Sequence, residues 1–298
     1  MKKALVFLLV SLLLCSAAHA GSILEAPFVP DSAGAAVAAA AAEALQLQLR
    51  LTEDADVANA ADIMLEDAGI LLCADQAVLI SSLQGYTSQD LRTAMRPVCR
   101  IAVSPLYLVV NTQAAEALGI SDAESLLSYV AEHEYEMYIA RHIDADVIDR
   151  AVIRLSDSVP VFTEGYPEEE IPSALENGEV LAAVYSGLQL AESGEALQPV
   201  CSLGSERTEA FPGLPCAAEL GIPECDGIGI FLFASADAQD ETVTQAAETC
   251  LGVGPEAAAV PGLSFAPLSG AELEDEIRRL FADYKDYMTA EGLFFYEE

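Results

Sequence analysis

The sequence predicts a two-lobed α/β protein in which each lobe is a mostly parallel sheet flanked by helices. Helix-like and strand-like segments alternate along the chain, which is typical of doubly wound sheets. Residues 69–74 are apolar on both faces, as expected for a parallel strand covered by helices. Two long apolar segments, 107–111 and 227–234, are expected to cross between the lobes. The predicted division is lobe 1 from 21–122 plus 236–298 and an inserted lobe 2 from 123–235.

The first half of the pattern rests on one capped helix and one alternating strand. Ser32 can cap a helix over 33–45 that is almost pure Ala, and residues 45–51 then alternate Leu with polar residues, which indicates a half-buried strand. The other expected elements are a strand at 23–29, a helix at 57–66, a strand at 69–74, a helical turn at 77–83 and strands at 98–103 and 107–111.

The second half continues the alternation and ends in an amphipathic helix. Ser269 and Glu272 have the spacing of a capping box, and apolar residues from Leu273 to Met288 then recur on one helix face. The expected helices before it are 122–132, 144–155, one beginning near Pro172, 188–194, 216–220 and 237–251. The expected strands are 135–140, 159–162, 179–185, 197–203, 227–234 and 263–267.

The amino terminus has the pattern of a cleavable secretory signal over residues 1–20. Lys2 and Lys3 precede an apolar run that is too short to span a bilayer, and Ala18-His19-Ala20 fits a cleavage site. We therefore expect a periplasmic or secreted chain with no transmembrane helix.

The charge is extreme, with 13 Lys and Arg against 48 Asp and Glu, a net of −35. Removing Lys2 and Lys3 with the leader changes the net charge to −37. This excludes nucleic acid and anionic membrane surfaces as partners, because both require a basic patch. A soluble surface for a salty or acidic environment explains this charge better than a cation-attracting function.

Six cysteines follow the leader, and an even number in an exported protein argues for disulfides. Sequence alone allows fifteen pairings. We expect Cys73–Cys99, which lie in strands of one lobe, and Cys216–Cys225, which flank a short helix; this leaves Cys201 to pair with Cys250.

Residues 175–224 carry the most specific pattern of the chain. A strand is followed by Ser205-Glu206-Arg207, a loop bounded by Pro212 and Pro215, and a helix that ends at Glu219-Leu220-Gly221-Ile222-Pro223. This order resembles the Bug family, the extracytoplasmic solute receptors of tripartite tricarboxylate transporters. The resemblance covers essentially the whole chain after the leader and implies two lobes, joined by two strands, with a ligand cleft between them.

The resemblance also implies where a ligand is gripped, namely by loops and helix N-termini that bind carboxylates. Pro27 and Phe28 match the family's first loop, but Asp31-Ser32 replace its Gly-Gly pair and Ala35 replaces its Asp. The second loop, Gly- and Thr-rich in the family, here contains Asp75 and Gln76. The candidate ligand-binding residues are Phe28, Asp31, Ser32, Ala33, Asp75, Gln76, Arg141, His142, Tyr166 and Tyr185.

Arg141 and His142 are expected to open a helix in the inserted lobe. A contact from them to a ligand carboxylate and a surface pair with nearby acids are equally favoured. The surrounding His133, Glu134, Glu136, Asp144 and Asp146 match no common metal-ligand spacing, so we expect a solvated face, no metal and no cofactor.

No motif typical of an enzyme is present, such as G-x-S-x-G or a P-loop. We expect a monomeric, non-enzymatic solute receptor that takes a small organic carboxylate or zwitterion and delivers it to a tripartite transporter. The alternative is a co-receptor with the same fold that presents its bound state to a membrane sensor kinase.

Overall fold

The computed structural model describes residues 23–143, 146–254 and 260–292. The residues cluster into two compact units, and each is discontinuous in sequence. Unit 1 comprises 1–101, 230–258 and 267–298, and unit 2 comprises 102–229 and 259–266. The predicted leader at residues 1–20 lies outside the described residues. Within the described ranges, no helix is both long and apolar enough to span a membrane.

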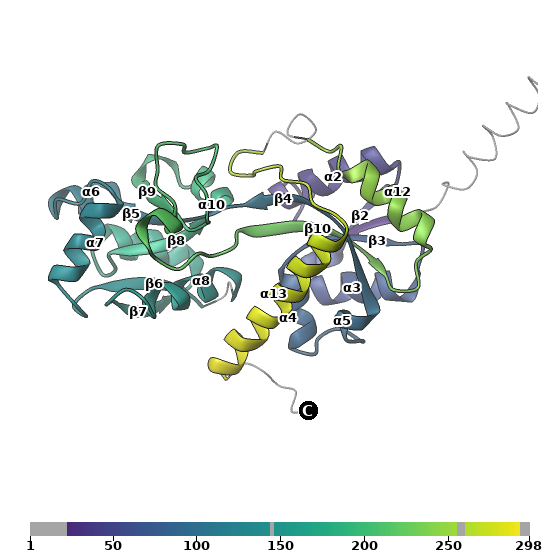
Figure 1. The fold of residues 1–298 in the computed structure, drawn as a ribbon, viewed down its shortest axis with the longest axis horizontal. Helices are drawn as coiled ribbons and strands as arrows, with labels where there is room; N and C mark the ends of the chain where they lie inside the picture. The colour runs from purple at the N-terminus through teal and green to yellow at the C-terminus, as the bar shows by residue number, and fades with distance from the viewer. Residues whose placement is uncertain (1–22, 144–145, 255–259, 293–298) are drawn as a thin grey trace, which may run out of the picture. The chain divides into compact units, whose positions relative to one another are not determined.

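Unit 1 is built on a five-stranded mixed sheet in the order β2-β1-β3-β10-β4. The pairs β1–β2 and β1–β3 are parallel, whereas β10 runs antiparallel to β3. Figure 1 shows α2 and α12 on one side of this sheet and α3, α4 and α13 on the other. Its strands are β1 (Ile23–Ala26), β2 (Gln48–Leu51), β3 (Leu71–Asp75), β4 (Met95–Ser104) and β10 (Ile228–Ser235). Its helices are α2 (Ala33–Leu45), α3 (Val57–Glu66), α4 (Ala77–Leu83), α5 (Leu91–Ala94), α12 (Asp240–Cys250) and α13 (Ala271–Ala290), with a 3-10 turn at Glu53–Ala55.

Unit 2 has a second five-stranded mixed sheet in the order β7-β6-β8-β5-β9. Alternate residues of β5 enter two separate cores, since Leu106, Leu108 and Val110 lie in one and Tyr107 and Val109 in the other. Its strands are β5 (Leu106–Asn111), β6 (Tyr138–His142), β7 (Phe162–Tyr166), β8 (Ala182–Ser186) and β9 (Leu197–Ser202). Its helices are α6 (Thr112–Ala117), α7 (Ala123–Glu132), α8 (Asp146–Ser156), α9 (Ile171–Glu176), α10 (Gly187–Glu192) and α11 (Ala217–Leu220), with 3-10 turns at Glu168–Glu170 and Gly194–Ala196.

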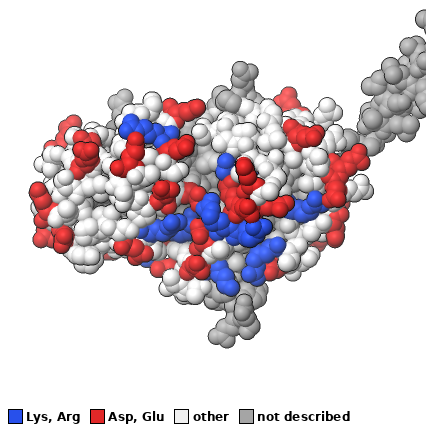
Figure 2. Space-filling view, in the orientation of Figure 1, with Lys and Arg blue, Asp and Glu red and all other residues white. Residues whose placement is uncertain are grey.

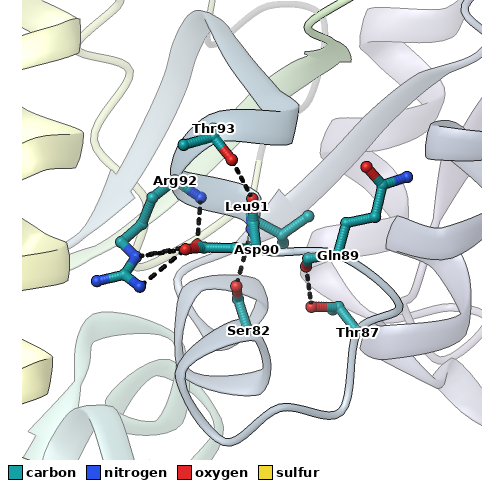
Figure 3. Close-up of polar contacts among 7 residues, drawn as sticks. All are labelled: Ser82, Thr87, Gln89, Asp90, Leu91, Arg92 and Thr93. Atoms are coloured by element: carbon teal, nitrogen blue, oxygen red, sulfur yellow. Dashed lines mark hydrogen bonds and ion pairs between the residues drawn. The ribbon is translucent and has the colours of Figure 1, made fainter. Parts of the chain in front are cut away.

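Local signals placed several elements correctly. Helices α2, α3 and α4 have the predicted bounds, and Ser32 caps α2 by accepting a hydrogen bond from the Ala35 amide at 3.2 Å. Short α5 was not predicted. Figure 3 shows that Asp90 caps it: its carboxylate accepts the Arg92 amide at 3.0 Å and also pairs with the Arg92 guanidinium.

Three other predictions were wrong, two of them because strand formation depends on pairing with distant segments. Residues 263–267 form no strand; they make one isolated bridge to β4 at Ser264, and a second bridge follows at Leu268. Strand β7 begins at Phe162, where the predicted strand ended. Helix α13 begins after Gly270, with no side-chain cap, so the predicted capping box at Ser269 and Glu272 does not form.

The boundaries between the units also differ from the predicted lobes. The chain passes between the units within β4, after Ile101, and within β10, after Gly229, and 259–266 belong to unit 2. Strand β5, predicted to cross between lobes, lies wholly inside the unit 2 sheet. A long apolar run such as 107–111 is compatible with a crossing strand, but a strand at the centre of a covered sheet has the same composition.

The predicted disulfides are not present, because the described structure holds all six cysteines as free, buried thiols. Strand β10 lies between β3 and β4 in the sheet, and this separates the strands of Cys73 and Cys99. Cys225 packs into the unit 2 core, where its sulfur lies 4.0 Å from the Ala151 carbonyl oxygen. Cys201 and Cys250 belong to different units. Burial raises the pKa of Cys99 to about 11 and those of Cys201 and Cys250 to about 12.

Among the charged side chains of the visible face, acidic ones are the more widespread (Figure 2). Figure 2 shows red side chains spread over this face, whereas many of the blue ones gather on and beside α13. Two basic residues of α13 face acids of the same helix: Arg278 pairs with Asp275 at 2.5 Å, and Arg279 lies 3.8 Å from Asp283. Because these pairs are partly exposed, each contributes on the order of 0–1 kcal/mol to stability.

Candidate functional site

The first candidate site lies at the carboxyl ends of two adjacent parallel strands of unit 1. Leu24 of β1 is the register partner of Leu71 of β3, so both strands end at the same edge of the sheet. In open α/β sheets, ligands bind outside this edge. The chain leaves β1 through Phe28, Asp31 and Ser32 into α2, and it leaves β3 through Asp75 and Gln76 into α4. The fold thus brings the predicted residues of both loops to one sheet edge.

The loop after β1 has a fixed shape. Asp31 is exposed and has a left-handed backbone with a φ of 66°, and the Ser32 amide donates to the Val29 carbonyl at 3.1 Å. A Cβ atom at Gly34 would lie 2.4 Å from Cδ1 of Phe28. Glycine at the first turn of α2 therefore lets the half-buried Phe28 ring pack against the helix.

The loop after β3 uses its two predicted residues for local structure. The Asp75 carboxylate accepts the Ala77 amide at 2.8 Å, so this side chain turns back to its own helix. Burial raises the pKa of Asp75, and this hydrogen bond opposes the rise. Gln76 is 1% exposed and accepts the Tyr284 hydroxyl at 2.8 Å, which links α4 to α13. The burial of Gln76 gives it a structural role.

The second candidate site lies at the carboxyl ends of three parallel strands of unit 2. Strand β6 pairs in parallel with β7 and β8, and His142 is the register partner of Tyr166. The rings of His142 and Tyr185 meet edge to face with centroids 5.9 Å apart. Arg141, His142, Tyr166 and Tyr185, which are far apart in sequence, therefore share this edge of the sheet.

Arg141 and His142 end strand β6 and do not open a helix, since α8 begins at Asp146. The Arg141 guanidinium makes a two-pronged ion pair with Asp149 of α8, with distances of 2.9 Å and 2.5 Å. Asp149 is buried and Arg141 is 28% exposed at its side chain. Of the two interpretations of Arg141, the ion pair with a nearby acid is therefore present, and it is partly buried. His142 is fully buried.

The two tyrosines of this edge are hydrogen-bond donors at neutral pH. Burial raises the pKa of Tyr185 to about 12, with a further contribution from the Glu168 carboxylate. Partial desolvation and the nearby Glu179 carboxylate raise the pKa of Tyr166, whose hydroxyl donates to Glu179 at 3.4 Å. A phenol that stays protonated can donate to a ligand carboxylate.

Two features of the unit 2 edge were not predicted from the sequence. Ser186, at the end of β8, and Gln189 form a reciprocal capping box at 3.3 Å and 2.8 Å, and the S-x-x-Q pattern could have revealed it. The second is a close backbone contact: a Cβ atom at Gly187 would lie 2.4 Å from the carbonyl oxygen of Gly262. No local signal indicates that contact.

Two surface cavities lie elsewhere. One of about 390 Å³ is lined by Asn111, Thr112, Glu176 and their neighbours. It lies at the end of β5 that is distant from Ser186, because Leu106 is the residue of β5 that pairs with Ser186. The other, of about 410 Å³, lies between α13 and the α5–β4 segment. Neither contains a candidate ligand-binding residue.

The described residues contain no group of three or more His, Cys, Asp or Glu side chains that could hold a metal ion. Asp144, one of the acids considered in the sequence, lies outside the described residues. No protein-family model matches the sequence, and no curated protein matches it either.

Solved structures show the fold clearly. A TctC solute-binding protein from Polaromonas superposes with a TM-score of 0.74 at 15% identity, over 90% of this chain and 97% of that one. The periplasmic binding protein BugD gives 0.62 at 12% identity, over 91% and 97%. MatC from Rhodopseudomonas palustris with bound malate gives 0.61 at 17% identity, over 89% and 97%. The chain thus has the two-lobed fold of these binding proteins, as the resemblance implied.

Proposed function

We propose that this protein is a periplasmic solute receptor of the Bug type that binds a small organic carboxylate or zwitterion. The observation that carries the proposal is the fold shared with TctC and BugD over nine-tenths of the chain. The receptor proposal is also supported by the candidate residues of each unit, which lie at the carboxyl ends of its parallel strands, where α/β folds bind ligands. Its function is binding, with lobe closure, and not catalysis.

We propose further that the ligand carries few negative charges. A carboxylate held about 4 Å from Asp31 or Asp75 would meet a repulsion of up to about 4 kcal/mol at an effective dielectric of 20. A helix N-terminus stabilises a nearby carboxylate by only about 0.3–1 kcal/mol, which is less than this repulsion. The Asp75 carboxylate already accepts the Ala77 amide and so turns back to its own helix, which leaves exposed Asp31 as the stronger discriminator.

The unit 2 edge offers the hydroxyl of Tyr185, a residue that is 4% exposed, as a donor for one carboxylate, whereas the Tyr166 hydroxyl already donates to Glu179. The Tyr166 and Tyr185 hydroxyls stay protonated at neutral pH. The Arg141 guanidinium is paired with the Asp149 carboxylate, so we expect it to attract a ligand carboxylate less strongly than an isolated guanidinium would. MatC was solved with malate, which has two carboxylates. The proposal thus separates this protein from that neighbour by ligand charge.

Calorimetry with citrate, malate, glutamate and nicotinate tests the ligand class. We expect binding of a monocarboxylate or a zwitterion, and at least about a tenfold loss in Tyr185→Phe, since a donor to a charged group contributes about 1.5–3 kcal/mol. Tyr86→Phe, an exposed tyrosine of unit 1, is the matched control. Tight citrate binding that is unchanged in Asp31→Gly and Asp75→Gly would refute the charge argument. No binding of any small organic acid would refute the receptor proposal.

Delivery to a tripartite transporter, the periplasmic location and the monomeric state are parts of the same proposal. Cell fractionation should find a chain that begins near Gly21 in the periplasm, and sedimentation should give a monomer. Solute uptake should fall when the gene is deleted. A deletion that leaves uptake intact and abolishes a transcriptional response to the ligand would favour the sensor co-receptor instead.

A further inference from the structure

Unit 2 exposes three aromatic side chains, one of which, Phe162, packs against the other two. Tyr135 is 58% exposed, Tyr138 39% and Phe162 46%. The Phe162 ring centroid lies 5.6 Å from that of Tyr135 and 5.5 Å from that of Tyr138, both tilted. Single exposed apolar residues are ordinary, but a contiguous exposed aromatic group is typical of interaction surfaces. We call these three residues the aromatic patch.

The fold holds the aromatic patch in a defined arrangement. Tyr138 and Phe162 are register partners at the first positions of β6 and β7. Tyr135 sits in the connection before β6, where its amide donates to the Pro160 carbonyl at 2.9 Å. Its backbone is left-handed, with a φ of 56°, a conformation that is unfavourable for a bulky side chain. The chain therefore keeps a strained tyrosine on the surface, against Phe162, rather than a glycine or asparagine that this conformation favours.

The surroundings of the aromatic patch are acidic. Glu134 and Glu136 flank Tyr135 and are exposed. Glu164 is also exposed and follows Phe162 by two residues, which places it on the same face of β7. The segments 131–138 and 160–166 contain no Lys or Arg. Aromatic faces attract cations, and Arg guanidinium groups stack on them particularly well.

We propose that the aromatic patch is a docking surface for a protein partner that presents arginine side chains. The aromatic faces supply stacking surfaces, and the three glutamates supply complementary charge. A second copy of this chain would bring like-charged carboxylates together, so self-association through the patch is disfavoured. The acidic rim likewise opposes an anionic lipid surface.

The position of the patch leaves the proposed ligand edge unobstructed. Tyr138 begins β6 and His142 ends it, and Phe162 begins β7 and Tyr166 ends it. At about 3.3 Å per residue, the patch and the ligand edge are roughly 13 Å apart along the strands. A partner could therefore contact unit 2 without occupying the edge that carries Tyr166 and Tyr185.

Two peptides of equal charge separate stacking from general attraction to an acidic protein. We would measure the affinity of labelled tetra-arginine amide and tetra-lysine amide by fluorescence anisotropy at about 150 mM NaCl. Net attraction acts on both peptides alike, whereas aromatic stacking favours arginine. We expect the intact protein to prefer tetra-arginine by roughly 3- to 10-fold.

The variants test the patch itself. Tyr135→Gly suits the left-handed backbone and Phe162→Thr suits a strand, so both should fold, and Tyr135→Gly should melt no lower than the parent. The double variant should lose the arginine preference, and Tyr86→Thr, at an exposed tyrosine of unit 1, should keep it. Three results would overturn the proposal: an arginine preference that survives in the double variant, no preference in the parent, or a parent dimer that the double variant lacks. Because no solute is added, failure here is distinguishable from failure of the receptor proposal.

Discussion

Replacing Gly262 with alanine should destabilise unit 2 strongly. Gly262 has a left-handed backbone with a φ of 83°, and an added Cβ atom would lie 2.0 Å from the carbonyl oxygen and 2.3 Å from the carbonyl carbon of Gly187. Both obstacles are backbone atoms, so they cannot rotate away as a side chain would. The Leu188 amide, which donates to Ser104 Oγ at 3.1 Å, would lie 2.8 Å from the same Cβ atom.

The expected loss follows from two terms. The left-handed conformation costs an alanine about 1–2 kcal/mol, and forcing a methyl group into a packed contact costs about 1–3 kcal/mol. Gly262→Ala should therefore lower the free energy of unfolding by about 2–5 kcal/mol. At roughly 2–4 °C per kcal/mol for a chain of this size class, Tm should fall by about 4–20 °C.

Gly119→Ala is the matched control, because Gly119 also lies in unit 2 and has a φ of 74° but has nothing within 4 Å of an added Cβ atom. Its free energy of unfolding should fall only by the cost of a left-handed alanine, about 1–2 kcal/mol. Urea unfolding and calorimetry of both variants give the comparison. Equal losses would refute a close contact between Gly262 and Gly187. Since Gly187 follows Ser186 at the candidate ligand edge, Gly262→Ala should also weaken solute binding.

Three further outcomes are expected. Tm should rise between low salt and roughly 1 M NaCl, where the screening length falls to about 3 Å, because self-repulsion at a net charge near −37 opposes compactness; a flat Tm would contradict this. All six thiols should resist modification at pH 8 until the protein unfolds, and a reductant should leave Tm unchanged, since they are free and buried; peptide mapping that finds a disulfide would show otherwise. Asp90→Ala should cost about 0.5–2 kcal/mol at pH 7 through loss of the α5 cap. The hydrogen bonds from Arg92 hold the pKa of Asp90 below its usual value. The stabilisation by Asp90 is therefore present above about pH 4 and is lost as pH falls through the lowered folded-state pKa. A difference in unfolding free energy between the parent and Asp90→Ala that does not shrink in acid would refute this.

The sequence by itself determined the fold class and most local elements. Alternating helix and strand patterns predicted two covered sheets, and caps such as Ser32 fixed helix starts, because these signals depend only on residues within a few positions of each other. The Ser205–Pro223 pattern also led to the solute-receptor fold that the structural comparisons show. Candidate residues after β1 and β3 could be chosen because parallel strands direct their carboxyl ends to one edge.

Tertiary structure alone decided which distant segments meet. Strand β10 enters the sheet between β3 and β4 and so separates Cys73 from Cys99, which no local pattern reveals. Arg141 meets Asp149, Gln76 meets Tyr284, and Gly187 meets Gly262 through contacts set by sheet order and helix packing. A side chain's availability to a ligand depends on such contacts, and burial and hydrogen bonding are properties of the assembled chain. The sequence therefore identified the edges where a ligand is expected, and the folded structure decided which side chains there are already engaged.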